Sequence, residues 1–257
     1  MEIVTVPCLR DNFAYLIICP ETRQAGVVDP SEADPVLAAV EKAGVTLTAI
    51  LTTHHHWDHV GGNKKLVQTF PDLVVYGFGA DRDRIPKQTV FLEEGDAVRI
   101  GNLVGSISHN PGHTTGAITY YFGDAAFTGD TLFAAGCGRL FEGDAADMKR
   151  SLNDVIGSRP ATTRLFFGHE YTASNLAFAL SVEPDNTAVQ EKLAWARECG
   201  DKGVFTTPST VADEWATNPF MRLDSPAIHA TVKREEPDND LSPVSVLRVL
   251  RAMKDNF

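Results

Sequence analysis

The sequence lacks the paired cysteines of a disulfide framework or a thiol redox motif. Its four cysteines, Cys8, Cys19, Cys137 and Cys199, are scattered and form no C-x-x-C pair. This pattern is typical of buried thiols in a reducing compartment. Residues 1–7 are expected to form a strand and lack the basic and apolar segments of a secretory signal, and no apolar run is long enough to span a membrane. We therefore expect a cytoplasmic protein that does not associate with membranes.

Positive charge is scarce. The chain has 23 Lys and Arg against 34 Asp and Glu, for a formal net charge of -11. This balance argues against a general binder of nucleic acid or anionic lipid, although a local basic patch can still bind a small anionic substrate. The sequence also lacks a G-x-S-x-G elbow or any other nucleophile motif, so we do not expect a protein nucleophile.

The length of 257 residues allows one large domain, or one domain with an appendage. Short β-type runs alternate with helical patterns up to residue 171, and beyond it only helical patterns remain. We therefore expect a catalytic domain over residues 1–172 and a smaller helical domain over residues 173–257. The expected strands span 13–19, 24–28, 46–51, 73–76, 118–122, 125–128 and 165–167, with two or three more within 90–108. The expected helices span 34–44, 62–70, 147–156, 173–181, 187–199, 211–216 and 244–253.

A dense group of metal-binding residue types follows the expected strand 46–51. It reads H-x-H-x-D-H and supplies His54, His56, Asp58 and His59. A chain leaving a strand can direct His54 and His56 to one side and His55 to the other. Imidazole and carboxylate groups suit zinc, iron and manganese, and four of them exceed what one open metal site needs from one segment. Two glycines follow, as a chain turning sharply away from a crowded site would need.

Three further ligand candidates each follow an apolar strand and lie beside a glycine. They are His113, Asp130 and His169. A single histidine or aspartate in such a turn is commonly a hydrogen-bonded loop residue or a cap. Seven such residues together predict a site for two divalent metal ions.

The other histidines are weaker candidates. His55 is expected to support the site without binding metal. His109 precedes a Pro-Gly turn, and His229 lies in a polar helical stretch where solvent exposure is expected. Asp29, at a strand end, is expected either to orient a ligand imidazole or simply to form the turn before Pro30.

These residues and their order resemble the metallo-β-lactamase superfamily, whose fold is an αββα sandwich with the metal site at one edge. Within this superfamily, the sequence resembles the hydroxyacylglutathione hydrolase (glyoxalase II) family. The resemblance runs essentially from end to end and includes the helical carboxy-terminal segment. The segments that carry it are residues 8–13, 52–63, 127–133, 136–139, 168–171 and 218–222.

The resemblance implies a role for each candidate residue. His54, His56 and His113 would bind one metal ion, Asp58, His59 and His169 would bind the second, and Asp130 would bridge them. Zinc is the expected metal, and iron and manganese are alternatives. Two residues depart from the family pattern and are expected to affect substrate affinity more than activity. Phe141 stands where tyrosine is common, and Ala117 stands where many relatives have a second histidine. The positions matching the glutathione-binding residues are Arg139, Phe141, Tyr171, Arg251 and Lys254.

The implied reaction is hydrolysis of a glutathione thioester such as S-D-lactoylglutathione, the second step of methylglyoxal detoxification, by a monomeric enzyme. Two metal ions sharing a water lower its pKa, so a hydroxide attacks the thioester carbonyl while Asp58 and Asp130 fix the metal geometry and accept a proton. The thiolate of pKa about 8.5 leaves with little help. The alternatives are another hydrolase of the superfamily (a lactonase, β-lactamase or RNA-processing nuclease), a one-iron persulfide dioxygenase and a metal-free binding module.

Overall fold

The computed structural model describes all residues from Met1 to Phe257, and contacts between Cα atoms divide them into two compact units. The first unit comprises Met1–His109 and Gly116–Gly129. The second comprises Asn110–Thr115 and Asp130–Phe257. None of the helices in either unit has the length and apolar character that crossing a membrane requires.

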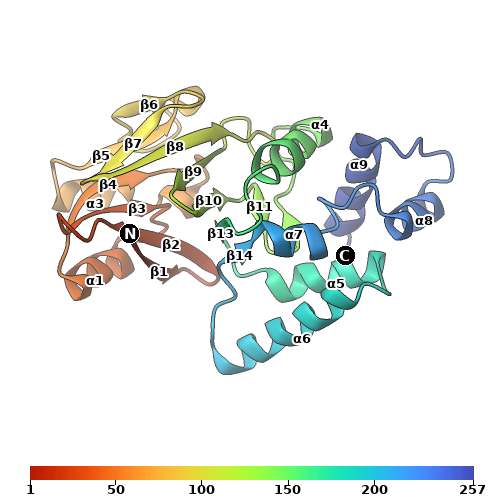
Figure 1. The fold of residues 1–257 in the computed structure, drawn as a ribbon. Coiled ribbons are helices and arrows are strands. Elements are labelled where there is room, and N and C mark those ends of the chain that lie inside the picture. The colour runs from red at the N-terminus through yellow and green to blue at the C-terminus, as the bar shows by residue number, and fades with distance from the viewer. The chain divides into compact units, whose positions relative to one another are not determined.

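The first unit contains a six-stranded sheet in which the strands follow chain order (Figure 1). The first three strands pair antiparallel, and the third to sixth pair parallel. Because parallel neighbours end at the same edge of a sheet, the residues that follow β3 and β4 are brought together. The strands are β1 (Glu2–Cys8), β2 (Asn12–Ile18), β3 (Gln24–Val28), β4 (Thr46–Leu51), β5 (Val74–Phe78) and β6 (Val90–Leu92).

Four antiparallel strands of the first unit, adjacent in the order β10-β9-β8-β7, pack on one face of this sheet. The rings of Tyr15 and Phe127 lie 5.7 Å apart between the two layers. A Cβ added at Gly26 would lie 2.6 Å from Ile100 Cδ1, so glycine permits close packing of β3 on β7. The four strands are β7 (Ala97–Ile100), β8 (Leu103–His109), β9 (Ile118–Phe122) and β10 (Ala125–Gly129).

Helices cover the other face of the six-stranded sheet. Leu16 and Ile18 of β2 belong to one buried cluster with Val36 and Leu66, and every residue of β2 is buried. The helices are α1 (Ala33–Ala43), α2 (Trp57–Val60) and α3 (Asn63–Thr69), with a 3₁₀ turn η1 (Gly79–Asp81). Gly44 follows the last residue of α1 in a left-handed conformation, and α1 begins at Ala33, one residue before the expected start.

The second unit is mainly helical. A short hairpin of β11 (Leu132–Phe133) and β12 (Gly136–Cys137) follows Asp130, and β13 (Arg164–Phe167) pairs with β14 (Ser209–Thr210). The helices are α4 (Ala145–Lys149), the π-helix η2 (Arg150–Ile156), α5 (Thr172–Val182), α6 (Thr187–Lys202), α7 (Val211–Thr217), α8 (Pro226–Glu235) and α9 (Pro243–Asp255). The expectation of no strand after residue 171 was wrong because of β14, and α8 was not among the expected helices.

The last helix begins as its sequence predicts. Ser242 accepts a hydrogen bond from the backbone N–H of Ser245, and Pro243 occupies the first turn. Its apolar face, including Leu247 and Leu250, is buried, and α9 packs against α4 and α8. The expected helix 147–156 instead continues from α4 into a π-helix.

Candidate metal centre

Asp29 fixes the chain where it leaves β4. It lies directly after β3 in a left-handed conformation, with φ of 46°, and is buried. Its carboxylate accepts hydrogen bonds from the Thr53 backbone N–H (2.8 Å) and the Thr53 hydroxyl (2.6 Å). The Tyr120 hydroxyl donates to the Thr52 carbonyl at 3.0 Å, and burial raises the pKa of Tyr120 well above its usual value. The start of the H-x-H-x-D-H segment is therefore held before any metal binds.

The hydrogen bonds of this segment determine which ring nitrogens face a ligand. The Thr53 hydroxyl donates to Asp29, so it accepts at 3.0 Å from His54 Nδ1, which leaves His54 Nε2 as the basic nitrogen. His59 Nδ1 lies 3.0 Å from Asp29 Oδ2, so its Nε2 is likewise basic. Orienting the second nitrogen of a ligand imidazole in this way is general in metal sites. Asp29 thus contacts both Thr53 and the His59 ring, as an orienting carboxylate would.

The nitrogen and oxygen atoms of this segment that could bind metal are spaced like ligands of one metal ion. His54 Nε2 and His56 Nδ1 lie 3.2 Å apart. Two ligands at metal–nitrogen distances of about 2.0–2.1 Å in a tetrahedral site stand about 3.3 Å apart. Asp58 Oδ2 lies 3.8 Å from His59 Nε2 and accepts from the Asn12 amide at 3.2 Å. The first unit therefore presents two adjacent pairs of ligand atoms.

Three groups of the first unit lie outside these pairs. The His55 ring points away as expected: its Nδ1 lies 3.3 Å from Asp81 Oδ1, and its Nε2 accepts from Arg84. His109 stacks on Phe78 with the ring centroids 4.4 Å apart. The oxygens of Asp29 also lie near His54 and His59, but they are engaged by Thr53 and His59, so we regard this carboxylate as a hydrogen-bond partner and not a ligand.

The two glycines after the H-x-H-x-D-H segment let the backbone lie close to other backbone atoms. Gly61 and Gly62 form the expected turn between α2 and α3, and both have ordinary negative φ, so the turn does not depend on a left-handed conformation. A Cβ at Gly61 would lie 2.5 Å from the Ser31 carbonyl oxygen, and one at Gly62 would lie 2.6 Å from the Pro30 carbonyl oxygen. Their absent side chains let α2 pack against the chain after Asp29, which brings His59 to that carboxylate.

The second unit presents the other three ligand candidates around one oxygen. Asp130 Oδ2 lies 3.6 Å from His113 Nε2 and 3.3 Å from His169 Nε2, and all three residues are buried. His113 Nδ1 lies 2.8 Å from the Arg139 carbonyl oxygen, which fixes Nε2 as its basic nitrogen. A carboxylate oxygen within 3.6 Å of two imidazole nitrogens is suited to bridging two metal ions.

The chain between Asp130 and Phe141 wraps closely around these ligands. A Cβ at Gly138 would lie 2.2 Å from the Asp130 carbonyl oxygen and 2.7 Å from His113 Nδ1. The Phe141 N–H donates to the His113 carbonyl at 3.2 Å, and the two rings lie 5.3 Å apart. Only glycine at position 138 allows Arg139 to reach the His113 ring.

The expected glutathione-binding residues, all in the second unit, differ in exposure. The side chain of Arg139 is 64% exposed, and its Nε lies 3.5 Å from Asp255 Oδ1. Phe141 is also exposed, and Tyr171 stacks on His169 with centroids 4.8 Å apart. Lys254 Nζ lies 3.3 Å from Ser174 Oγ, and burial, followed by Arg251 and Arg139, lowers its pKa.

Arg251 is buried, and its hydrogen-bond partners were not expected from the sequence. Its side chain is 7% exposed, Nη1 donates to the Cys137 carbonyl at 2.8 Å, and Nη2 donates to Asp255 at 3.1 Å. Asp255 was not recognised in the sequence, although its position four residues after Arg251 is the spacing of a helical ion pair. His229, expected to be solvated, is partly buried and lies 2.7 Å, through Nε2, from the Leu223 carbonyl oxygen.

Comparisons with known proteins agree with this geometry. Residues 11–169 match the family model described as the metallo-beta-lactamase superfamily, and residues 170–257 match the one described as hydroxyacylglutathione hydrolase C-terminus. A hydroxyacylglutathione hydrolase from a Synechococcus species is 48% identical over the full length of both chains. A cytoplasmic hydroxyacylglutathione hydrolase from Arabidopsis thaliana is 44% identical over 100% of this chain and 99% of its own. A crystal structure of TTHA1623 in a di-iron-bound form is 28% identical, with a TM-score of 0.59, and covers 86% of this chain and 100% of its own.

Proposed function

Because the chain belongs to the hydroxyacylglutathione hydrolase family of the metallo-β-lactamase superfamily, we propose that it hydrolyses S-(2-hydroxyacyl)glutathione, typically S-D-lactoylglutathione, to glutathione and a 2-hydroxy acid. The family match also establishes the expected αββα fold with a helical carboxy-terminal part, and it establishes that the chain binds divalent metal. The observation that carries the proposed activity is that Asp130 Oδ2 lies close to Nε2 of both His113 and His169.

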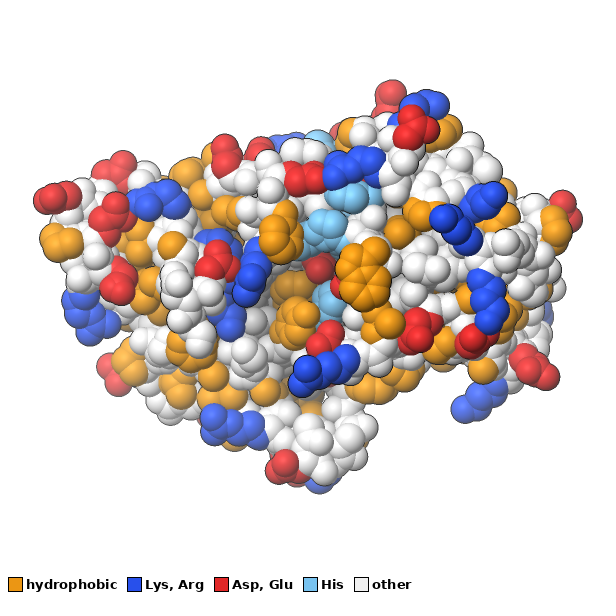
Figure 2. Space-filling view, turned by 180° about the vertical axis from the view of Figure 1, so that it is seen from behind, with side chains coloured by type: hydrophobic (Ala, Val, Ile, Leu, Met, Phe, Trp, Pro, Cys, Tyr) orange, Lys and Arg blue, Asp and Glu red, His pale blue; other side chains and the backbone are white.

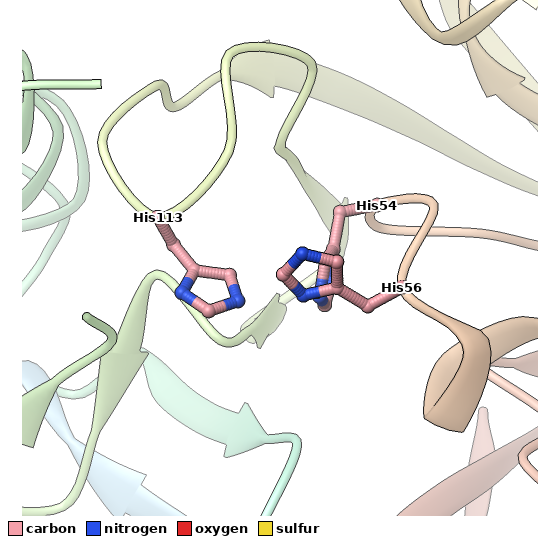
Figure 3. A group of neighbouring side chains, drawn as sticks. All are labelled: His54, His56 and His113. Atoms are coloured by element: carbon pink, nitrogen blue, oxygen red, sulfur yellow. The ribbon is translucent and has the colours of Figure 1, made fainter. Parts of the chain in front are cut away.

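The proposed site holds two metal ions. His54, His56 and His113 form the first set of ligands, and Figure 3 draws these three side chains, two from the segment after β4 and one from the loop after β8. Asp58, His59 and His169 would form the second set, and Asp130 would contribute to both. The tautomers fixed by Thr53, Asp29 and the Arg139 carbonyl support these assignments, because each leaves Nε2 available to a metal.

The residues of the chain mainly position the metal ions and the reacting groups. When bound, two divalent ions supply an activated water and polarise the thioester carbonyl. Asp130 and Asp58 would hold the ions, and one of the two carboxylates would accept the proton that the water releases. Asn12 donates a hydrogen bond of 3.2 Å to Asp58 Oδ2, the oxygen that lies 3.8 Å from His59 Nε2, and so fixes this carboxylate. The thiolate leaving group needs no dedicated acid, since thiols have a pKa of about 8.5.

The glutathione moiety is proposed to contact Arg139, Phe141, Tyr171, Arg251 and Lys254. Arg139 and Lys254 supply exposed or half-buried positive charge that suits the carboxylates of glutathione. Phe141 provides an apolar ring without the hydroxyl common in the family. Because a local basic patch suffices, the net charge of -11 does not oppose this binding.

The finer properties of the enzyme are also proposed. We propose zinc in both sites, with iron or manganese as metals that the same ligands accept. We further propose a cytoplasmic monomer that binds no nucleic acid or membrane, with a catalytic domain over residues 1–172 and a substrate-binding domain over residues 173–257. The face drawn in Figure 2, where positive and negative side chains are interspersed, supports the absence of nucleic-acid binding.

The test combines a metal count with an assay. Protein purified without chelator and reconstituted with zinc is expected to hold close to two metal ions per chain and to hydrolyse S-D-lactoylglutathione. One ion per chain after reconstitution with excess metal would instead favour the one-iron dioxygenase, and little metal would favour a binding module. Two ions without thioester hydrolysis would indicate another hydrolase of the superfamily, such as a lactonase.

A further inference from the structure

Two residues with different proposed roles flank Glu170. His169 is a proposed metal ligand, and Tyr171 is a proposed glutathione contact. Their rings stack with the centroids 4.8 Å apart and an interplanar angle of 5°. The Phe133 ring packs against both, with centroid distances of 6.0 Å to His169 and 5.4 Å to Tyr171. Because the two rings are packed as a pair, a shift of the backbone at Glu170 would move the metal ligand and the substrate contact together.

The Glu170 carboxylate binds a residue that is distant in the sequence. Oε2 accepts a hydrogen bond from the Thr206 backbone N–H at 2.8 Å, and Oε1 accepts one from the Thr206 hydroxyl at 2.6 Å. Both carboxylate oxygens are therefore engaged by Thr206, and they attach the residue between His169 and Tyr171 to the loop that follows α6.

Thr206 also binds the residue on the other side of Tyr171. Its hydroxyl donates to Glu170, so it accepts from the Thr172 hydroxyl, and the two hydroxyl oxygens lie 2.6 Å apart. Thr172 is the first residue of α5 and is 1% exposed, and Thr206 is 5% exposed. Both neighbours of Tyr171 are therefore attached to one buried threonine.

The loop that carries Thr206 is itself held on both sides. Before Thr206, the Val204 N–H donates to the Cys199 carbonyl of α6 at 2.9 Å. After it, β14 pairs antiparallel with β13, the strand that leads to His169. Thr206 is therefore a fixed support for residues 169–172.

We propose that Glu170 is a positioning residue that sets the orientation of His169 and Tyr171 together, through its two hydrogen bonds to Thr206. This inference rests on the proposed dinuclear hydrolase and deepens it, because it assigns one support to a metal ligand and to a substrate contact. A residue that only stabilises the fold would leave the metal centre unchanged when it is replaced. A carboxylate that acts through its charge could not be replaced by an amide, whereas a positioning carboxylate could.

The test compares Glu170→Ala with Glu170→Gln. Alanine removes both acceptors and leaves the buried Thr206 N–H without its partner. Glutamine retains the shape and both contacts. Its carbonyl accepts from the Thr206 N–H, and its NH₂ donates to the Thr206 hydroxyl, which turns its proton toward Thr172.

A second pair of variants changes Thr206 itself. Thr206→Val removes only the hydroxyl, and Thr206→Ser retains it. Thr231→Val is the matched control, because the buried Thr231 hydroxyl donates to the Val182 carbonyl at 3.0 Å, outside this network. Metal release into excess chelator is timed without substrate, followed by the visible absorption of the cobalt-substituted proteins and by KM for S-D-lactoylglutathione.

Glu170→Ala and Thr206→Val are expected to release one of the two metal ions faster, by about 10- to 100-fold in the alanine variant, the usual effect of losing the support of a ligand. Their cobalt spectra are expected to change, because the geometry around His169 changes, and their KM is expected to rise, because Tyr171 is displaced. Glu170→Gln, Thr206→Ser and Thr231→Val are expected to behave as the wild type in all three measurements.

Wild-type metal release and cobalt spectrum in Glu170→Ala would overturn the proposal and leave Glu170 with a role in stability alone. A change in metal release without a rise in KM, or the reverse, would refute the joint positioning of His169 and Tyr171. Equal impairment of Glu170→Gln and Glu170→Ala would also refute it, because the charge would then be what matters.

If Glu170→Ala does not fold, Thr206→Val measured against Thr206→Ser decides by the same readouts. A wild-type enzyme that binds two metal ions but leaves glutathione thioesters intact would refute the proposed activity. The metal-release and cobalt comparison would still decide whether Glu170 positions His169.

Discussion

Replacing Asp29 by asparagine tests how the first half of the site is held together. Asparagine has nearly the same shape and tolerates the left-handed backbone at this position, where φ is 46°. The substitution therefore removes charge and acceptor capacity with little backbone strain. Asp29 touches no proposed substrate atom, so its effects must pass through Thr53 and His59.

The size of the expected effect of Asp29→Asn follows from three contacts of the Asp29 carboxylate. One carboxylate oxygen accepts from the Thr53 N–H at 2.8 Å, and the other accepts from the Thr53 hydroxyl at 2.6 Å and lies 3.0 Å from His59 Nδ1. An asparagine NH₂ facing His59 forces the ring proton onto Nε2, the proposed ligand nitrogen. The flipped amide instead leaves the buried Thr53 N–H facing another donor, which costs about 1–3 kcal/mol.

We therefore expect Asp29→Asn to bind metal about 10- to 100-fold more weakly. The metal-free protein is expected to unfold with a free energy lower by about 1–3 kcal/mol. Chelator competition measures the first effect, and urea denaturation of the metal-free protein measures the second. Asp34→Asn is the matched control, because its exposed pair with Lys65 is worth about 0–1 kcal/mol. Metal affinity within twofold of the wild type in Asp29→Asn would refute the assignment of Asp29 as the partner of His59.

Two other predictions concern the second unit. Asp130→Ala is expected to reduce kcat for S-D-lactoylglutathione nearly to zero while circular dichroism shows an intact fold, because one oxygen lies near both His113 and His169; near-normal kcat would remove Asp130 from the site. Lys254, whose pKa is lowered first by burial and then by Arg251 and Arg139, is expected to lose its charge below the usual lysine pKa of about 10.4. Substrate binding that depends on this charge is complete at neutral pH and weakens as the pH rises through the lowered pKa, so the wild-type KM should rise on the alkaline side. Lys254→Arg should lack this rise, and identical pH profiles for the two proteins would show that Lys254 does not bind the substrate.

The sequence predicts the ligand pattern well because that pattern is local. His54, His56, Asp58 and His59 lie within six residues after a strand, and alternation correctly separates His55 from them. The strand–glycine–ligand pattern also locates His113 and His169, which the structure places around Asp130 within one unit. Assigning each residue to a particular metal ion stays a prediction.

The backbone partners of the ligands could not be predicted in the same way. The carbonyl of Arg139 orients His113, yet a carbonyl oxygen leaves no signal in the identity of its residue. The π-helix Arg150–Ile156 and the two-residue strand β14 were missed for a related reason, since tertiary packing and not local propensity sets such short or irregular pieces. Gly138 and the pair Gly61–Gly62 were visible as glycines, but close approach to other backbone atoms explains them only in three dimensions.

The burial of Arg251 shows how one helix face can carry two kinds of residue. Arg251 lies four residues after Leu247, on the stripe that α9 buries, whereas Lys254 lies three residues further along and is only partly covered. Spacing alone places both basic residues on one face and suggests a shared role. Burial separates them. The Arg251 guanidinium lies among the Cys137 carbonyl, Asp255 and Phe220, with its Nε buried and without a hydrogen-bond partner, whereas the Lys254 ammonium at the helix end is only partly buried. Two basic residues at helical spacing can therefore differ widely in burial, which the spacing alone does not predict.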